Sequence, residues 1–331
     1  MAPLLEKYCI DAEDFEAHED FSKDHYAALM LELHDRLMTF TGLDHVDHWM
    51  ATVNWSPALS QSANGGKGVV VGLLDTPITS SSLIGGAVNE TQGFGLSDVD
   101  HGAGVASILA GAHDGQGVMG VAPNADFLVY NPFNESFTAT WDDVTKGIQE
   151  LAFMSEASII NLSLGVKGYT LHPDWRNVFY DFSAGLGTID TLLVKSAGNS
   201  GVSQSVDVDF GISDAFRRLI VVGSVDAAGN ISEFSNRPGD ACLLHWGSCR
   251  DGNRLMDRFL VAPGELVLVQ DNEGNLTRAS GTSLSAPQVA GAAALLQSRW
   301  EWLRHYPAET ADILLETATD LGAPGTDAVF G

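Results

Sequence analysis

The sequence predicts an α/β fold, a three-layer sandwich with a mostly parallel central sheet, preceded by a helical N-terminal extension. From residue 65 onward, short apolar strands alternate with helical stretches, which is typical of a parallel sheet covered by helices. The strands are continuous apolar runs rather than alternating ones, so both faces of the sheet are expected to be buried. With 331 residues, of which 45% are hydrophobic, the chain is long enough for one large domain or two smaller ones.

Residues 1–50 differ in composition from the rest, because they are acidic and poor in glycine. Residues 21–38 are predicted to form an amphipathic helix, whose apolar face carries Tyr26, Leu29, Leu33 and Leu37. We therefore expect residues 1–50 to form an acidic, mainly helical extension and residues 51–331 to form the main domain.

The main domain contains five clear strand signals and three helix signals in sequence order. Strands are predicted at residues 69–74, 125–130, 158–162, 191–194 and 219–223. Helices are predicted from His101 onward, over residues 141–156, and over residues 283–296. In the second helix, Val144, Ile148, Leu151 and Ala152 share a helical register.

The helix over residues 283–296 is composed of Ala, Leu and Val with almost no polar face, which predicts a fully buried helix. Pro287 has no N–H to bond the carbonyl of residue 283. This loss is tolerable if that bond is the first of the helix, so the helix is expected to begin at about Ser283. Taken alone, Ser283 is best interpreted as a capping serine.

Charge excludes several classes of partner. Lys and Arg number 17 against 43 Asp and Glu, which gives a formal net charge of -26. Nucleic acid is excluded as a partner, since phosphate binding needs a basic face. No apolar run reaches the ~18 residues of a transmembrane segment, and residues 1–7 lack the pattern of a signal peptide.

Two groups of residues suggest weaker interpretations. The residue types in His45-Val46-Asp47-His48 could bind a metal ion, although a solvated helix end or loop is the preferred interpretation. Cys242 and Cys249 bracket a six-residue loop and could close a disulfide, which would leave Cys9 unpaired. Two unrelated free thiols are the alternative.

Three residues combine the chemistry that nucleophilic acyl transfer requires. Asp75 ends a buried strand, His101 begins a helix, and Ser283 begins the buried helix. A hydroxyl, an imidazole that takes its proton, and a carboxylate that orients the imidazole are the groups needed. Asn199 follows the strand at 191–194, where its amide could donate to an oxyanion.

With these residues the chain resembles the subtilisin-like serine proteases from about Asn54 to its end. The order Asp, His, Ser along the chain is that of subtilisin itself. The matching motifs are Asp75-Thr76, His101-Gly102, Val105-Ala106, Gly120-Val121-Ala122-Pro123, Asn161-Leu162-Ser163-Leu164-Gly165, Ala197-Gly198-Asn199, Val261-Ala262-Pro263-Gly264 and Gly281-Thr282-Ser283.

The resemblance implies a role for each matching residue. Ser283 is expected to be the nucleophile, His101 its general base, Asp75 the orienting carboxylate, and Asn199 the oxyanion donor. Ser163, Leu164 and Gly165 are expected to pair with the substrate backbone, and Ala197 and Gly198 to line the pocket for the residue before the scissile bond.

The implied function is that of a serine endopeptidase acting on polypeptides through an acyl-enzyme. No cofactor is required for this chemistry; structural calcium is compatible with the resemblance and the acidity, but no loop has the spacing that would identify its ligands. A non-catalytic binding or adhesion module on the same scaffold is the alternative.

Several residues depart from the family pattern. Pro77 stands where Gly usually follows Asp-Thr, so the turn beside the carboxylate is expected to differ. Asp100 precedes His101, where Gly or Ser is commoner, and we expect its charge to raise the pKa of the imidazole.

Residues 317–331 resemble the tail of subtilases that form passengers of bacterial autotransporters. On this resemblance the chain is expected to be truncated at its C-terminus, and the natural protein to be secreted or held on the bacterial surface by a C-terminal membrane-anchoring domain. Residues 1–50 are expected to be a permanent extension, with a propeptide occupying the cleft as the alternative.

Overall fold

The computed structural model describes residues 29–31, 33–34, 44–78, 88–93, 100–184, 191–211 and 215–331. The chain divides into two compact units, residues 1–45 with 114–117, and residues 46–113 with 118–331. Of the helix predicted over residues 21–38, residues 29–31 and 33–34 are helical, and the rest lies outside the described residues. The N-terminal extension therefore stays a prediction, and the fold below is that of the second unit.

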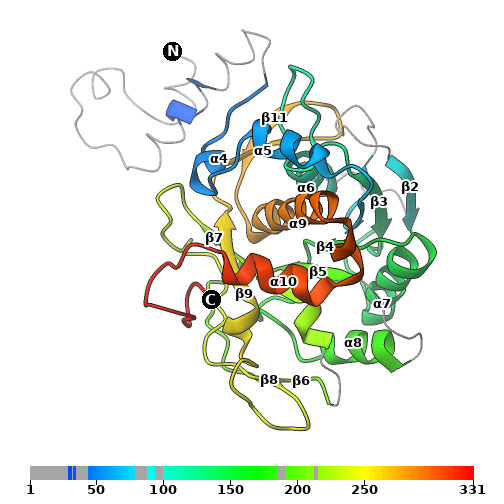
Figure 1. The fold of residues 1–331 in the computed structure, drawn as a ribbon, viewed down its shortest axis with the longest axis vertical. Coiled ribbons are helices and arrows are strands. Elements are labelled where there is room, and N and C mark those ends of the chain that lie inside the picture. The colour runs from blue at the N-terminus through cyan, green and yellow to red at the C-terminus, as the bar shows by residue number, and fades with distance from the viewer. Residues whose placement is uncertain are drawn as a thin grey trace. The chain divides into compact units, whose positions relative to one another are not determined.

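The centre of this unit is a parallel sheet in the order β2–β3–β1–β4–β5–β7–β9 (Figure 1). Every neighbouring pair in it is parallel, which confirms the predicted α/β fold. Its strands are β1 (Val70–Leu74), β2 (Val88–Gly93), β3 (Asp126–Asn131), β4 (Ile159–Leu162), β5 (Leu192–Ser196), β7 (Leu219–Val225) and β9 (Phe259–Pro263). Two small sheets pair β6 (Val208–Asp209) with β8 (Leu243–Leu244), and β10 (Val267–Gln270) with β11 (Leu276–Ala279).

Helices cover both faces of the sheet, because successive strand residues point to opposite sides. In β1, Val71 and Leu73 belong to one apolar cluster and Leu74 to the other. The first cluster contains residues of α6 (His101–Ala110), α9 (Thr282–Arg299) and α10 (Pro307–Glu316); the second contains residues of α7 (Trp141–Gln149) and α8 (Trp175–Ala184). The short helices α4 (His48–Thr52) and α5 (Pro57–Ser62) precede β1.

Each predicted strand and helix of the main domain is present, with shifted ends. The helix predicted over residues 141–156 is α-helical to Gln149 and continues as a π-helical turn over Glu150–Met154. β5 extends two residues beyond its predicted end and includes Lys195. Elements without a prediction include α8, α10, β9 and the hairpin β10–β11.

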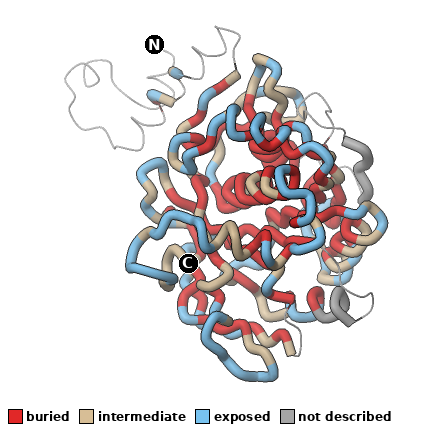
Figure 2. The backbone as a smooth tube through the Cα atoms, viewed as in Figure 1, coloured by how far each residue is buried: buried red, intermediate tan, exposed pale blue. Residues whose placement is uncertain are grey.

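Helix α9 is buried over most of its length (Figure 2), as its composition predicts. It begins at Thr282, one residue earlier than expected, so Pro287 removes a bond from inside the first turns rather than the first bond. The carbonyl of Ser283 accepts instead from the Oγ of Ser163, at 2.9 Å. Ser163, which follows β4, thus supplies the hydrogen bond that Pro287 cannot donate to the carbonyl of Ser283.

The topology places a crevice beside β1. From β1 the chain first fills the sheet on one side with β2 and β3, and then crosses to the other side with β4. Ligands in open α/β sheets bind at such a switch point, outside the carboxyl ends of the strands. Asp75 follows β1 and Ser163 follows β4, so both lie at this switch point.

Asp47 anchors the start of the unit and is 3% exposed, so the expected solvated end or loop at residues 45–48 is wrong for this residue. Its carboxylate accepts from the N–H of His48 at the start of α4 and from the N–H of Leu268, each at 2.8 Å. It also pairs with the guanidinium of Arg278 at 2.7 Å. Asp47 therefore ties α4 to the hairpin β10–β11.

We expect Asp47→Ala to lower the free energy of unfolding by about 3–5 kcal/mol, because it leaves a partly buried guanidinium without its carboxylate. Urea denaturation followed by circular dichroism measures this. The matched control is Asp251→Ala, which removes the same charge from an exposed turn. Equal stabilities of the two variants would contradict the anchoring role.

Candidate active site

Asp75 and His101 form a close, mostly buried pair at the switch point. The Nδ1 of His101 lies 2.7 Å from the Oδ1 of Asp75. The carboxylate side chain is 1% exposed and the imidazole 37% exposed. The Nδ1 edge of the imidazole is therefore held by the carboxylate, while solvent or a ligand can reach the rest of the ring.

The start of α6 docks onto the residues after β1 through a glycine. The N–H of Gly102 donates to the Oγ1 of Thr76 at 2.8 Å. A Cβ on Gly102 would lie 2.1 Å from the carbonyl oxygen of Thr76, so no larger residue fits without displacing backbone. This close approach places His101 beside Asp75.

The negative charge of Asp75 raises the pKa of His101 above its ordinary value, against the opposing effect of burial. The sequence suggested that Asp100 would do this. In the structure, the Asp100 carboxylate accepts instead from the backbone and side-chain N–H groups of Asn272, each at 3.1 Å. Asp75 is the charge that raises the pKa of His101, and the expectation for Asp100 is not supported.

The second carboxylate oxygen of Asp75 has no hydrogen-bond partner among the described residues. Its Oδ1 accepts from the N–H of Thr76 at 2.7 Å as well as facing His101. Pro77 follows and has no N–H to offer. The departure noted at Pro77 thus coincides with an unpartnered carboxylate oxygen.

Ser283 lies in the first turn of α9, where N–H groups have no partner within the helix. Its Oγ has a long contact of 3.5 Å with the carbonyl oxygen of Ser163, and its own carbonyl accepts from the Oγ of Ser163. Ser163 is positioned in turn by the Nδ2 of Asn161, at 2.9 Å. The end of β4 therefore holds Ser283 through two contacts with one residue.

The side chain of Asn199 is oriented by Thr282. The Oδ1 of Asn199 accepts from both the N–H and the Oγ1 of Thr282, each at 2.9 Å. A backbone N–H can only donate, so the oxygen must face Thr282 and the amide nitrogen must face away. Asn199 is exposed, and its Nδ2 is available to an acceptor outside the protein.

The turn that carries Asn199 is held by a fully buried amide, Asn236. Its Nδ2 donates to the carbonyls of Tyr169 and Ala197, and its Oδ1 accepts from the N–H groups of Ser200 and Val202. All of its bonding capacity is used, which fixes the turn after β5. No motif in the sequence singled out Asn236, because its role depends on contacts distant along the chain.

The residues expected to contact substrate lie at the ends of neighbouring strands. Leu164 and Gly165 continue from β4, and Gly165 is exposed. Ala197 and Gly198 continue from β5, the strand paired with β4. The fold therefore brings the two segments to the same edge of the sheet as Ser283.

Away from this edge, Cys242 and Cys249 are joined by a disulfide, with their Cα atoms 5.7 Å apart. Among the described residues, no three His, Cys, Asp or Glu side chains converge on a point that could hold a metal ion. Structural calcium therefore stays a prediction without named ligands. Of the helices searched in the described part of the chain, none is long and apolar enough to cross a membrane.

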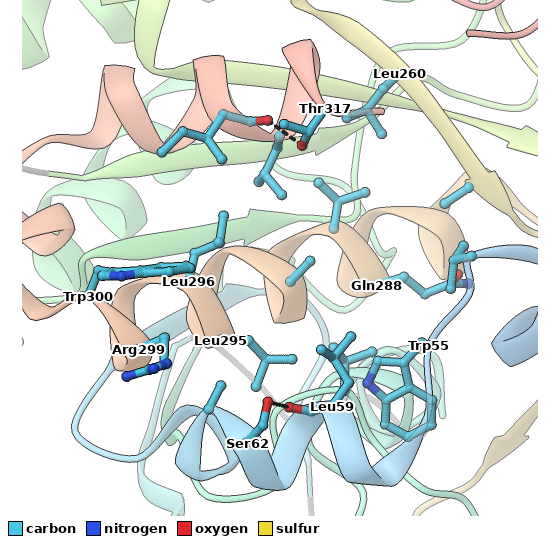
Figure 3. Close-up of a pocket in the computed structure, with 18 of the residues that line it drawn as sticks. Trp55, Leu59, Ser62, Leu260, Gln288, Leu295, Leu296, Arg299, Trp300 and Thr317 are labelled. Carbon is cyan, nitrogen blue, oxygen red and sulfur yellow. Dashed lines mark hydrogen bonds between the residues drawn. The ribbon is translucent and has the colours of Figure 1, made fainter. Parts of the chain in front are cut away.

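A separate apolar hollow of about 430 Å³ lies between α5, α9 and α10. Figure 3 shows Trp55 and Leu59 near α5, Leu295 and Leu296 on α9, and Trp300 just after the end of α9. None of the candidate site residues lines it. The hollow is therefore distinct from the site at the strand ends.

Comparison with known proteins gives consistent results. The model of the subtilase family matches residues 66–331. Subtilisin DY of Bacillus licheniformis is 31% identical over 268 residues, which cover 78% of this chain and 88% of that protein. The major intracellular serine protease of Bacillus subtilis (strain 168) is 31% identical over 246 residues, covering 70% of this chain and 69% of that protein.

Solved structures show the same likeness. The structure of the patellamide maturation protease PatA matches with a TM-score of 0.58 and 28% identity, over 80% of this chain and 91% of that chain.

We expect Thr282→Val to lower kcat for peptide hydrolysis about tenfold or more, with KM little changed. The variant keeps the size of the side chain but removes the hydroxyl that accepts from Gly198 and donates to Asn199. The Gly198 N–H then has no partner among the described residues, and the Oδ1 of Asn199 keeps only the N–H of Thr282. An unpaired buried group costs ~1–3 kcal/mol, and ~1.36 kcal/mol corresponds to a factor of ten in rate. Thr282→Ser retains the hydroxyl and should retain kcat; an unchanged kcat in Thr282→Val would contradict the orienting role.

We expect Asp75→Asn to lower the pKa of His101 below that of a free histidine, since burial then acts without the opposing charge. Titration of the His101 ring protons by NMR measures the change. Asp100→Ser is the control and should leave this pKa in place.

The same shift affects stability. Because the pKa of His101 is raised in the folded state, its protonated form stabilises the fold fully below the pKa of an unfolded histidine, ~6.5. This contribution is lost as pH rises through the raised value, and Asp75→Asn should abolish it. Thermal denaturation of both proteins across this pH range tests the point.

Proposed function

This chain belongs to the subtilase family and is a serine-type endopeptidase, and we propose that Asp75, His101 and Ser283 carry out its chemistry. The observation that carries the proposal is the 2.7 Å contact between His101 and a buried Asp75 at the switch point of the sheet. Ser283 is the second residue of α9, which packs against α6, the helix that begins with His101. The three residues are in the chain order of subtilisin itself.

In the proposed mechanism, the Nε2 of His101 takes the proton of Ser283 as its Oγ attacks the carbonyl carbon of the scissile peptide bond. The Oγ must first turn from the Ser163 carbonyl toward His101, which its long 3.5 Å contact permits. Asp75 accepts from Nδ1–H, fixes the tautomer, and stabilises the imidazolium that forms.

The tetrahedral oxyanion is stabilised by two donors in this proposal. One is the Nδ2 of Asn199, which faces away from Thr282, and the other is the N–H of Ser283 in the first turn of α9. The positive end of the helix dipole adds to the second. His101 then returns its proton to the leaving amine, and water, deprotonated by His101, releases the acyl group.

The substrate backbone is proposed to pair with residues 163–165 as an added strand. Ala197 and Gly198, at the end of the neighbouring strand, then line the pocket for the residue before the scissile bond. No cofactor enters these steps.

A location outside the cell is also proposed, with the disulfide between Cys242 and Cys249 as its support, because such bonds persist in oxidising compartments. Secretion or attachment to a bacterial surface fits this chemistry equally. The likeness of residues 317–331 to autotransporter passengers, and the anchoring domain that it implies, rest on sequence resemblance alone.

We expect a fluorophosphonate probe to label the wild-type protein, and Ser283→Ala to abolish both labelling and peptide hydrolysis. The matched control is Ser285→Ala, two residues further along α9, whose buried Oγ has no partner among the described residues and should be dispensable. Asn199→Ala should retain labelling and lose ~10²–10³ in kcat, the range known for the oxyanion donor of subtilisin. A wild-type protein that neither reacts with the probe nor cleaves peptides would favour the non-catalytic binding module.

A further inference from the structure

Lys195 is a buried cation next to the proposed substrate site. It lies in β5 and is 1% exposed. Its Nζ donates to the carbonyl of Thr170 at 3.1 Å and to that of Ser196 at 2.5 Å. No carboxylate within the described part of the chain pairs with it, although buried charges are normally paired. The ring of Trp175 also lies near the ammonium, with its centroid 5.9 Å from the Nζ. An ammonium has three N–H groups, so one of them has no oxygen acceptor among the described residues.

The ammonium faces the segment that is proposed to bind the substrate backbone. A Cβ built on Gly165 would lie 3.3 Å from the Nζ of Lys195, and among the described residues no other atom outside Gly165 and its two chain neighbours would lie within 4 Å of it. Gly165 itself is exposed. The space left by its missing side chain is therefore open, apart from the ammonium at its inner end.

Three segments surround this space. Ala197 lies on the same face of the β5 segment as Lys195, two residues further on. A Cβ on Gly198 would lie 2.7 Å from the Nδ2 of Asn236 and 3.3 Å from the carbonyl oxygen of Tyr169. The next carbonyl, that of Thr170, accepts from the Nζ of Lys195. Residues 165, 197–198 and 169–170 therefore lie around Lys195, and we take them as the walls of a substrate pocket with Lys195 as its floor.

The position of these walls identifies the substrate residue concerned. Ser163 contacts Ser283, and Asn199 contacts Thr282, so both wall segments begin at the nucleophile. A peptide that pairs with residues 163–165 and presents its carbonyl carbon to Ser283 places the side chain of that same residue between the walls. This is the residue immediately N-terminal to the scissile bond.

The chemistry of the floor favours an anion. Burial lowers the pKa of Lys195 to about 7, because no nearby negative charge offsets the loss of hydration. A carboxylate entering the pocket would provide that charge and the missing acceptor. Lysine to carboxylate bonds are among the stronger hydrogen bonds in proteins.

We propose that Lys195 is a specificity-determining residue that selects peptides with glutamate or aspartate immediately N-terminal to the scissile bond. The proposal rests on the proposed function, since it assigns a substrate class to that same site.

The test uses quenched-fluorescent peptides that are identical except for Glu, Gln, Leu or Lys at this position, with the cut site verified by mass spectrometry. The Glu and Gln peptides have the same shape, so their ratio isolates the charge. We expect the wild-type kcat/KM to favour Glu over Gln by roughly tenfold or more. In Lys195→Met this ratio should fall to about one, while the Leu peptide is cleaved better than before.

The control Lys67→Met removes an equal charge from an exposed position and should leave the ratio unchanged. If Lys195 serves only to hold the carbonyls of Thr170 and Ser196, Lys195→Met will lower the thermal midpoint without changing the ratio, which overturns the proposal. A wild-type ratio near one overturns it without any variant, and leaves the proposed function intact if other peptides are cleaved. Absence of both cleavage and fluorophosphonate labelling counts against the proposed function as well.

Discussion

The site depends on one constraint, the burial of α9. A helix packed on all sides cannot satisfy the N–H groups and carbonyls of its ends with water. The protein must supply partners from the loops that reach its N-terminus, and these loops follow β4 and β5. Ser163 and Asn199 are those partners, contacting Ser283 and Thr282. The hydrogen bonds that complete the helix are therefore also the ones that assemble the candidate site.

A second consequence is that the loops need rigid supports of their own. Asn236 uses both atoms of its amide to hold the turn after β5, and the glycine at the start of α6 lets that helix touch Thr76. Buried polar networks that are fully satisfied fix a single arrangement of the groups they contact. The stiffness of the site thus comes from residues that make no contact with the scissile bond.

The sequence was sufficient for the sheet, because its strands are unbroken apolar runs that only a doubly covered parallel sheet can bury. It also pointed to Asp75, His101, Asn199 and Ser283 as candidates by their types and order, and the roles of these four residues stay proposals. It was insufficient where the deciding partner is distant in the chain. The sequence placed Asp47 in a solvated helix end or loop, whereas in the structure its carboxylate contacts Arg278 and Leu268.

Lys195 illustrates the same limit. The strand predicted from the sequence ended at Val194 and left out Lys195, a residue type that is seldom buried. In the structure two backbone carbonyls, contributed by a loop 25 residues earlier and by the next residue, allow the strand to continue with the lysine inside. The burial of this side chain depends on tertiary contacts, so it cannot be predicted from composition or from the periodicity of the sequence.

Pro287 adds a hydrogen bond between α9 and the segment that follows β4. With an N–H at that position, the carbonyl of Ser283 would have its partner within α9, and only the contacts of Thr282 with Gly198 and Asn199 would tie this turn to the edge of the sheet. With proline, the backbone of Ser283 is tied to Ser163, which also begins the segment proposed to receive the substrate strand. A peptide that binds to that segment would therefore contact the residue that also holds the backbone of Ser283. Substrate binding and the position of the serine thus depend on the same residue, Ser163.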